Sequence, residues 1–376
     1  MTEHTPLTEI ARLFLRLGTT AFGGPAAHIA MMEDEVVRRR GWLTRNEFLD
    51  YLGATNLIPG PNSTELAIHI GYARAGWPGL LVAGASFILP AALIVTALAA
   101  GYVAYGTLPH VGGILYGVKS VVIAVVAQAL WGLGRSAVKT TGLALVAAAA
   151  VLGIAAGMDE IVVLVAAGGI CALVRVASRG QHPALVPVIA TVTTASAGTA
   201  AVAVPFGLWP LFLVFAKIGA VLFGSGYVLL AFLRADLVQR LGWLTERQLL
   251  DAVAVGQITP GPLFTTATFI GYVLGGSAGA AIATIGIFLP AFIFVALSTA
   301  IVPRLRRSPT AGAVLDGVNV ASLALMAVVT WHLGRVALVD TLTVAVAALS
   351  LVALVRYRVN SAWLVVAGGF VGWIAG

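Results

Sequence analysis

Two short Pro-Gly-Pro segments carry the clearest chemical signal in this chain. Pro59-Gly60-Pro61 and Pro260-Gly261-Pro262 are each flanked by amide or hydroxyl side chains. These are Asn56, Asn62, Ser63 and Thr64 around the first segment, and Gln257, Thr259, Thr265 and Thr266 around the second. Proline ends a helix, since it lacks a backbone donor and restricts the residue before it. A helix that restarts after the break presents N–H groups and a positive dipole end, which favour an anion.

A single Pro-Gly-Pro would equally suit a tight turn in a loop. Two copies at equivalent positions, each with polar neighbours, favour a binding site. The sequence therefore predicts that both segments bind a small anion.

Positive side chains within apolar segments are the second candidates, because a divalent oxyanion needs positive partners in a low dielectric. Arg16 and Lys217 occupy matched positions in the first apolar segment of each half, and Lys119 lies early in the run 111–134. Lys217 is the deepest of the three and is expected to bind the anion. Arg16 could instead extend to the membrane interface as an anchor.

Proton coupling is the role expected of Glu65, with His28 and His69 as weaker candidates. A carboxylate beside an anion site repels the substrate unless it is protonated, as a coupled site requires. Each histidine could instead serve as a hydrogen-bond partner in helix packing. Asp50 and Asp251 are interpreted as structural. Small residues at Gly23, Gly24 and Gly224 allow close approach of a ligand or of another helix.

The two segments belong to an internal duplication. An offset of 201 positions pairs Phe22 with Phe223, and Gly41-Trp42-Leu43-Thr44 with Gly242-Trp243-Leu244-Thr245. After Pro-Gly-Pro the offset falls by one, and the match continues to Gly134-Arg135 and Gly334-Arg335. The chain is therefore expected to contain two repeats, 1–177 and 207–376, joined by a linker at 178–206.

Composition places the chain in the membrane. It has 376 residues, of which 60% are hydrophobic and only 10% charged, whereas a soluble domain is about 25% charged. Several apolar runs reach the roughly 17–25 residues that a spanning helix needs. The net charge of +7 is concentrated in short connections between these runs and does not indicate nucleic acid. The single cysteine, Cys171, excludes an internal disulfide, and no cleaved signal peptide is recognised at the N-terminus.

The expected fold is an all-α polytopic membrane protein of two inverted-topology repeats with about five spans each. In repeat one, a first apolar segment covers 7–32, interrupted by Arg16, Gly23-Gly24-Pro25 and His28, and a broken, re-entrant helix pair covers 44–75. The second helix of that pair begins at Asn62-Ser63, which are good capping residues. Four further spans end near Val176. Repeat two follows the same plan, with a first span at 207–233 and a broken pair at 244–275, and 185–204 is expected not to cross.

The distribution of charge predicts the orientation. Five crossings per repeat would leave the second repeat upside down relative to the first. The loop 135–139 and the connections 33–48, 175–182, 302–307 and 356–358 hold most of the Lys and Arg, so they are expected in the cytoplasm. Loop 335–340 and both termini are then external, as inversion requires.

These motifs carry a resemblance to a known family. The Phe-Gly-Gly segment, the Gly-Trp-Leu-Thr connector, the Asn-x-x-Pro-Gly-Pro-Asn-Ser-Thr-Glu run and their second copies resemble the long, two-domain bacterial form of the chromate ion transporter (CHR) family. The resemblance covers nearly the whole chain. It implies export of chromate across the cytoplasmic (inner) membrane, driven by the membrane potential or a proton gradient. Two departures are that Gly24 corresponds to Ser225, and that the second Pro-Gly-Pro lacks the Asn-Ser-Thr-Glu tail.

Other functions receive less support. No hydrolase, metalloprotease or Walker motif is present, so neither an enzyme nor an ATP-driven pump is expected, and no cofactor or metal. A carrier of sulfate or another oxyanion remains an alternative, because sulfate and chromate are both tetrahedral dianions. A membrane scaffold that binds lipid phosphate is the alternative from another class. The expected partners are the oxyanion and the lipid bilayer, with a homodimer left open.

Overall fold

The computed structural model describes residues 5–106, 108–178, 205–223, 226–306 and 308–375. This part of the chain is mostly helical and contains no strands. Gly224 and the segment 185–204 lie outside the described residues. Among the described residues, five helical segments are long and apolar enough to cross a membrane: Asn62–Tyr105, His110–Ala137, Glu160–Ala177, Leu263–Ser298 and Pro309–Ala337. The all-α polytopic fold predicted from composition is confirmed.

The helices of the first half are α1 (Leu7–Thr20), α2 (Gly24–Glu33), α3 (Arg45–Thr55), α4 (Asn62–Tyr105), α5 (Pro109–Ala137), α6 (Thr141–Ala155) and α7 (Glu160–Ala177), with the π-helical segment η1 (Asp34–Arg39) after α2. Those of the second half are α9 (Leu208–Val221), α10 (Leu229–Leu233), α11 (Glu246–Ile258), α12 (Thr266–Arg306), α13 (Pro309–Ala337), α14 (Thr341–Arg356) and α15 (Ser361–Ala375). The second half also contains the short 3-10 helices η2 (Gly226–Val228) and η4 (Leu263–Thr265) and the π-helical segment η3 (Arg234–Arg240).

The first apolar segment of each half is divided into separate helices, so the single span expected at 207–233 is not one continuous helix. In the first half the helix ends at Thr20 and a new one begins at Gly24. Gly23 and Gly24 adopt φ values of 104° and 78°, which glycine reaches without the clash of a Cβ atom. In the second half the corresponding break follows Val221. Each half therefore has a break in its first segment as well as at Pro-Gly-Pro.

The predicted break at Pro59-Gly60-Pro61 separates two helices that fold back on each other. Tyr51 of α3 stacks on His69 of α4 with ring centroids 5.5 Å apart, so the two helices run antiparallel about Gly60. The helix restarts at Asn62, as predicted, but its N-cap is Pro61, and no side chain caps it. Asn62 instead donates from its side chain to Asn56 Oδ1 at 2.8 Å.

A second reversal follows within α4. Ala75 and Gly76 depart from helical geometry, and Gly71 lies so close to Gly79 that a Cβ atom on either would overlap the other's carbonyl group. The segment 62–74 is therefore a separate half-helix of roughly 20 Å, shorter than a hydrocarbon core of about 30 Å. It packs against the long helix that begins near Trp77.

The second half repeats both reversals. Helix α11 leads into Pro260-Gly261-Pro262, and α12 has non-helical geometry at Gly275 and Gly276. Across this turn, the Thr268 and Thr284 hydroxyl groups lie 2.7 Å apart in a hydrogen bond. The duplicated sequence therefore folds into the same two consecutive helix reversals in each half.

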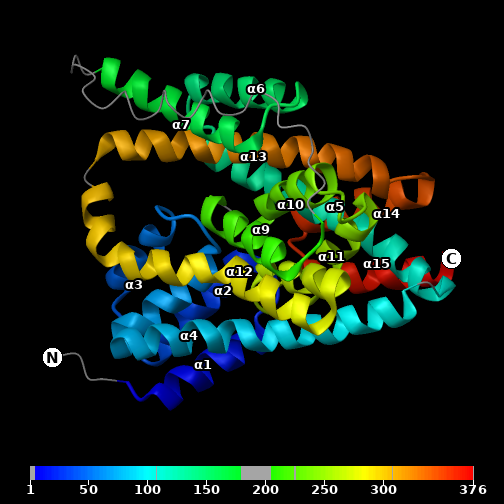
Figure 1. Ribbon diagram of the computed structural model, residues 1–376, viewed down its shortest axis with the longest axis horizontal. Coiled ribbons are helices and arrows are strands. Elements are labelled where there is room, and N and C mark those ends of the chain that lie inside the picture. Colours follow the sequence, from blue (N-terminus) through cyan, green and yellow to red (C-terminus); the bar gives the residue numbers. More distant parts are fainter. Residues whose placement is uncertain (1–4, 107, 179–204, 224–225, 307, 376) are drawn as a thin grey trace.

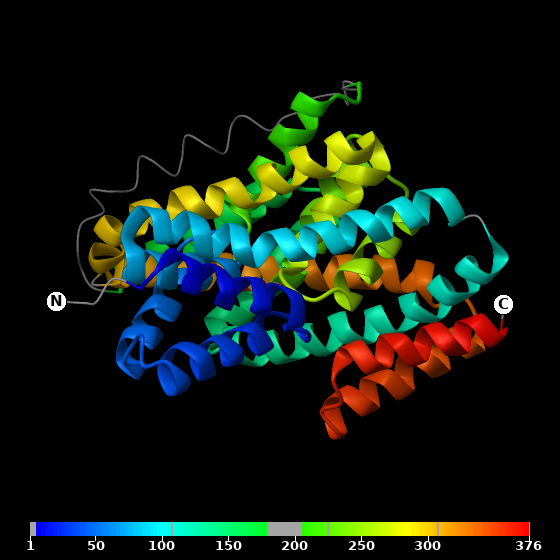
Figure 2. The ribbon, with the colours of Figure 1, turned by 90° about the horizontal axis from the view of Figure 1, so that it is seen from below.

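The two halves are interlocked. Helix α5 of the first half packs on α14 and α15, whereas α13 of the second half packs on α6 and α7. Figure 1 shows α6 and α7 along α13 at one edge, and Figure 2 shows the red α15 beside the teal α5. The long helices α4 and α12 also pack on each other. Each of these contacts that a helix of the first half makes with the second half is matched by a contact between the equivalent helices with the halves exchanged. This is the pattern that a pseudo-two-fold axis produces.

Glycine permits the closest of these crossings. A Cβ atom on Gly117 of α5 would overlap the carbonyl group of Gly368 in α15, and one on Gly317 of α13 would overlap that of Ala167 in α7. Gly117 and Gly317 are equivalent positions of the repeats. Small residues let helix backbones approach closely in membranes, so these glycines hold the last helix of each half against the other half.

Candidate functional site

The two Pro-Gly-Pro breaks are tied to the opposite halves by matched backbone hydrogen bonds. Gly60 N–H donates to Leu222 O at 2.8 Å, and Gly261 N–H donates to Ala21 O at 2.9 Å. Leu222 and Ala21 are equivalent residues at the break in the first segment of each half. Four interruptions of helical structure, two from each half, therefore converge at one place.

His28 braces this junction on the first-half side. Its ring is buried, and its Nε2 lies 3.1 Å from Ala21 O, the acceptor that also receives Gly261 N–H. Its Nδ1 lies 3.3 Å from Ser63 Oγ at the start of α4. Both ring nitrogens are thus engaged in linking helix ends. This is the hydrogen-bonding role that competed with proton coupling for His28.

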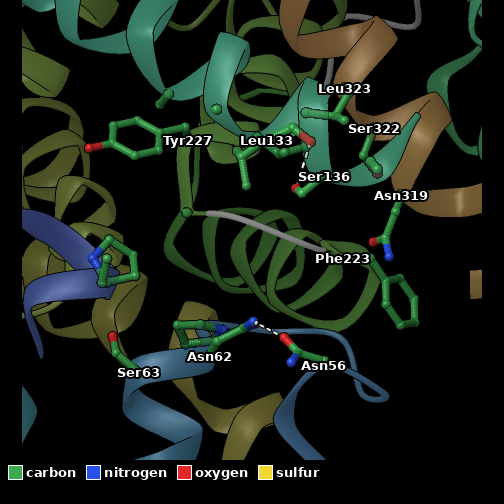
Figure 3. A pocket seen from close by; sticks show the side chains of 18 of the residues that line it. Asn56, Asn62, Ser63, Leu133, Ser136, Phe223, Tyr227, Asn319, Ser322 and Leu323 are labelled. Atoms are coloured by element: carbon green, nitrogen blue, oxygen red, sulfur yellow. Dashed lines mark hydrogen bonds between the residues drawn. The ribbon is translucent and has the colours of Figure 1, made fainter. Parts of the chain in front are cut away.

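A cavity of about 640 Å³ opens beside the junction. Its walls include the starts of both half-helices, through Pro61, Asn62 and Ser63 from one half and Pro262, Leu263 and Phe264 from the other. Figure 3 shows Asn56, Asn62 and Ser63 on one wall, facing Ser136 of α5 and Asn319 and Ser322 of α13. Gln128, Lys139, Tyr227 and Asp316 add further polar groups. A cavity with donors on facing walls can hold an oxyanion by hydrogen bonds.

One polar atom of the wall lacks a partner among the described residues. Ser322 is buried, and its Oγ makes no hydrogen bond. A buried hydroxyl group without a partner is unfavourable, and a bound oxyanion would provide the missing acceptor. Lys139 supplies a positive charge at the rim, 3.6 Å from Asp316 Oδ1 in a solvent-exposed pair.

The second Pro-Gly-Pro contributes less polarity than the first. The hydroxyl groups of Thr259, Thr265 and Thr266 all donate to carbonyl groups three or four residues earlier in their own segment. None of these three threonines lines the cavity, nor does Gln257, Pro260 or Gly261. This asymmetry agrees with the missing Asn-Ser-Thr-Glu tail of the second copy. At the two breaks themselves, the first half supplies the amide and hydroxyl groups of the lining, whereas the second half supplies apolar side chains and Tyr227.

The three positive residues predicted for the site lie elsewhere, each beside a carboxylate. Arg16 forms an ion pair with Glu35, and Lys217 Nζ lies 2.6 Å from Asp236. These two pairs occupy equivalent positions of the repeats. Lys119 Nζ lies 2.8 Å from Asp251 Oδ1, across the interface between the halves. The assignment of these cations to substrate binding stays a prediction without support from the cavity lining.

The Lys217–Asp236 pair leads to a stability prediction. Lys217→Met should lower the stability of the protein in the membrane, because the buried Asp236 then keeps only Arg240, 2.7 Å away, as an ion-pair partner among the described residues. Lys217→Met combined with Asp236→Asn should recover most of the loss, because the buried charge is then gone. Thermal unfolding of the purified variants in detergent measures both effects. A double variant no more stable than Lys217→Met alone would show that Lys217 does not stabilise the protein by neutralising Asp236.

Glu65 and His69 lie behind the cavity wall. Glu65 is fully buried, and neither carboxylate oxygen has a hydrogen-bond partner among the described residues. Its Oε1 faces Gly60 so closely that a Cβ atom there would overlap it. His69 Nε2 lies 3.4 Å from Ser298 Oγ of the second half. Glu65 therefore touches the break directly, whereas His69 serves the contact between the halves.

Of the residues predicted for the site, those that line the cavity are Gly23, Asn56, Pro61, Asn62, Ser63 and Pro262. Pro59, Gly60 and Thr64 are close in sequence to these residues but do not line the cavity. Gly24 lies beside the lining, since a Cβ atom on it would be 3.3 Å from Tyr227 Oη. The polar residues of α5 and α13 were missed. The signal that could have identified them is the presence of isolated polar residues in apolar spans. Gln128 is one such residue, and Asn319 is another, with Ser322 one helical turn later.

Discontinuous helices from two halves that meet at one cavity are a recurring design of membrane transport proteins. The sequence matches the chromate transporter family over residues 8–174 and again over 209–373. It is 31% identical over 358 residues to a probable chromate transport protein of Synechococcus elongatus, with 92% of this chain and 89% of that protein aligned. It is 32% identical to chromate transport proteins of Cupriavidus metallidurans (98% and 93% aligned) and Pseudomonas aeruginosa (96% and 90% aligned). No solved structure shows a significant match.

The chain belongs to the chromate transporter family. It is accordingly a multi-pass cell-membrane transport protein and not an enzyme.

Proposed function

We propose that this protein exports chromate from the cytoplasm, and that it binds the anion in the cavity between the two Pro-Gly-Pro breaks. The observation that carries the proposal is the convergence of both breaks on one cavity with amide and hydroxyl groups on facing walls. The names of the relatives support chromate as the transported ion. Such a site holds a tetrahedral dianion by several hydrogen bonds and a helix N-terminus, without a strong fixed charge that would prevent release.

Alternating access follows from the same arrangement. The repeats 1–177 and 207–376, joined by the linker 178–206, would lie in inverted orientation, so that each break faces the membrane side opposite to its partner's. Gly60 and Gly261 each tie one Pro-Gly-Pro break to the first segment of the opposite half, so these elements can tilt together and expose the cavity to one side at a time.

Everted membrane vesicles test the proposal, because their cytoplasmic face is outside. Vesicles that contain the protein should accumulate chromate when a proton gradient or potential is applied, and vesicles without it should not. Adding sulfate in excess tests the alternative that the protein is a sulfate carrier. Accumulation of sulfate with little chromate would show that sulfate, and not chromate, is the substrate. Vesicles that accumulate neither anion would contradict the proposed function.

Glu65 is the proposed proton carrier. A buried carboxylate without hydrogen bonds is costly when ionised, and the arrival of a dianion a few residues away adds repulsion. We therefore expect Glu65 to take up a proton as the anion binds and to release it after the anion leaves. Glu65→Gln keeps the size of the side chain and removes the titratable group.

Glu65→Gln should reduce chromate accumulation driven by a pH gradient that is acidic outside the everted vesicle about tenfold or more, because the proton on Glu65 enters together with the anion, while chromate exchange without a gradient is retained. The measurement compares gradient-driven accumulation with the exchange of labelled chromate in the same vesicles. Glu33→Gln, at a partly exposed carboxylate 3.7 Å from Arg45, is the matched control and should leave both rates unchanged. Equal gradient-driven accumulation by Glu65→Gln and the unmodified protein would exclude Glu65 as the carrier.

A further inference from the structure

A second cavity adjoins the central one and has a different character. Its volume is about 690 Å³, and its lining includes Gly23, Gln128, Gly132 and Tyr227, which also line the central cavity. The two spaces are therefore contiguous. The second cavity opens between the C-terminal end of α5 and the turn that joins α14 to α15.

Two arginines without carboxylate partners stand in this second cavity. Arg135 at the end of α5 and Arg358 in the α14–α15 turn both line it. Within the described part of the chain, no carboxylate lies within ion-pair distance of either. Arg16, Lys119 and Lys217, by contrast, are all neutralised by an adjacent carboxylate. Unneutralised guanidinium groups beside a cavity attract an oxyanion and can bind it in bidentate fashion.

Arg358 occupies a backbone conformation that is unfavourable for arginine. Its φ is 53°, and among the described residues no other non-glycine residue has a positive φ. The corresponding residue in the α6–α7 turn is Gly157, with a φ of 85°. Both residues precede a helix whose N-cap, Asn360 or Asp159, accepts from the N–H two residues later. A strained arginine where the repeat has glycine indicates that the side chain is needed at this position.

The charge of the two turns is reversed between the repeats. The α6–α7 turn carries Asp159 and Glu160, and the corresponding residues of the α14–α15 turn are the neutral Asn360 and Ser361. The α14–α15 turn thus combines a positive charge with amide and hydroxyl donors, whereas its counterpart is acidic. An anion is attracted to the first turn and repelled by the second.

We propose that Arg135 and Arg358 form an outer binding site for a tetrahedral oxyanion, through which the anion reaches the central cavity from one side of the membrane only. This inference rests on the proposed function for the identity of the anion. Both arginines lie in segments whose charge predicts a cytoplasmic location, which is the loading side of an exporter. Asn360 lines the second cavity and lies next to Gly23, which lines both cavities. A Cβ atom on Gly23 would lie 3.7 Å from Asn360 Nδ2, so the outer site adjoins the inner one at this point.

The kinetics of chromate accumulation in everted vesicles test the outer site. Arg358→Gly removes the charge but suits the backbone, so the protein should be at least as stable in thermal unfolding while KM for chromate rises about tenfold at low ionic strength. The maximal rate should stay nearly unchanged, because the central cavity is intact. Arg358→Lys should retain most of the affinity. Arg335→Met, at the repeat counterpart of Arg135 and outside both cavities, is the matched control and should leave KM unaltered.

Salt dependence and lipid composition distinguish the remaining explanations. The KM of the unmodified protein should increase with ionic strength, and this dependence should weaken in Arg135→Met combined with Arg358→Gly. The same kinetics in vesicles reconstituted from phosphatidylcholine alone show whether the arginines instead bind the phosphate of anionic lipids. An unchanged KM in Arg358→Gly, or an effect that requires anionic lipid, would overturn the outer site. Absence of chromate accumulation by the unmodified protein would refute the proposed function instead.

Discussion

Gly60→Ala should abolish chromate export. Gly60 has a φ of 139°, a region that glycine alone adopts readily, and the strain for another residue is about 1–3 kcal/mol. The new methyl group would also overlap Glu65 Oε1. The break would have to move, and with it the hydrogen bond from Gly60 N–H to Leu222 O that joins the halves. We expect export below a tenth of that of the unmodified protein.

Gly76→Ala separates backbone strain from the contact with Glu65. Gly76 also has a positive φ, 59°, but a Cβ atom there would meet nothing within 4 Å. It lies at the helix reversal away from the central junction. Export by equal membrane amounts of the two variants is the comparison. Gly76→Ala should retain most of the activity, and equal losses in both variants would contradict a special role for the Pro-Gly-Pro junction.

Lys119→Met should produce the largest loss of stability among charge substitutions. The ion pair of Lys119 with Asp251 joins α5 to α11 across the two halves, and both side chains are buried. Tyr102 Oη also donates to Asp251 Oδ2 at 2.9 Å, but a phenol does not neutralise a carboxylate. Removing one partner of a buried pair costs about 3–5 kcal/mol, because the other charge is left uncompensated. The expected result is a protein that unfolds at a much lower temperature or is degraded in the membrane.

Lys119→Met combined with Asp251→Asn distinguishes charge compensation from packing. The double variant should regain much of the lost stability, as measured by thermal unfolding in detergent. Lys139→Met is the control for an exposed pair, since its contact with Asp316 is 3.6 Å long and is worth about 0–1 kcal/mol. A double variant as unstable as Lys119→Met alone would contradict the account of the pair.

The breaks could be predicted because proline and glycine act locally. Pro59-Gly60-Pro61 must interrupt a helix in any surroundings, and its second copy made the interpretation firmer. Gly23-Gly24-Pro25 carries the same kind of local signal and interrupts the first apolar segment, whereas no proline marks the corresponding break after Val221.

The partners of the buried charges could not be predicted, because they depend on packing between segments far apart in the chain. Lys119 and Asp251 are brought together only by the contact of α5 with α11. The sequence indicated that Arg16, Lys119 and Lys217 need negative partners, and an anionic substrate was one way to provide them. Carboxylates of the protein itself provide them in the structure.

The far wall of the cavity depends on the interlocking of the halves. Ser136 and Ser322 lie in spans whose neighbours are mostly apolar, and each alone has an ordinary role in helix packing. Their placement opposite Asn62 follows from the positions of α5 and α13 beside the start of α4 (Figure 3). Helix periodicity within one segment carries no information about this arrangement.

Crystals of the protein grown with chromate test the central claim most directly, because the anomalous scattering of chromium locates the anion without interpretation of its shape. The account predicts a chromium peak in the cavity between the first turn of α4 at Asn62 and Ser63 and the start of the second half-helix at Leu263. A second, weaker peak beside Arg135 and Arg358 would match the outer site. A single strong peak at Lys119, at Lys217 or on the outer surface of the helices, with none between the two breaks, would contradict the account.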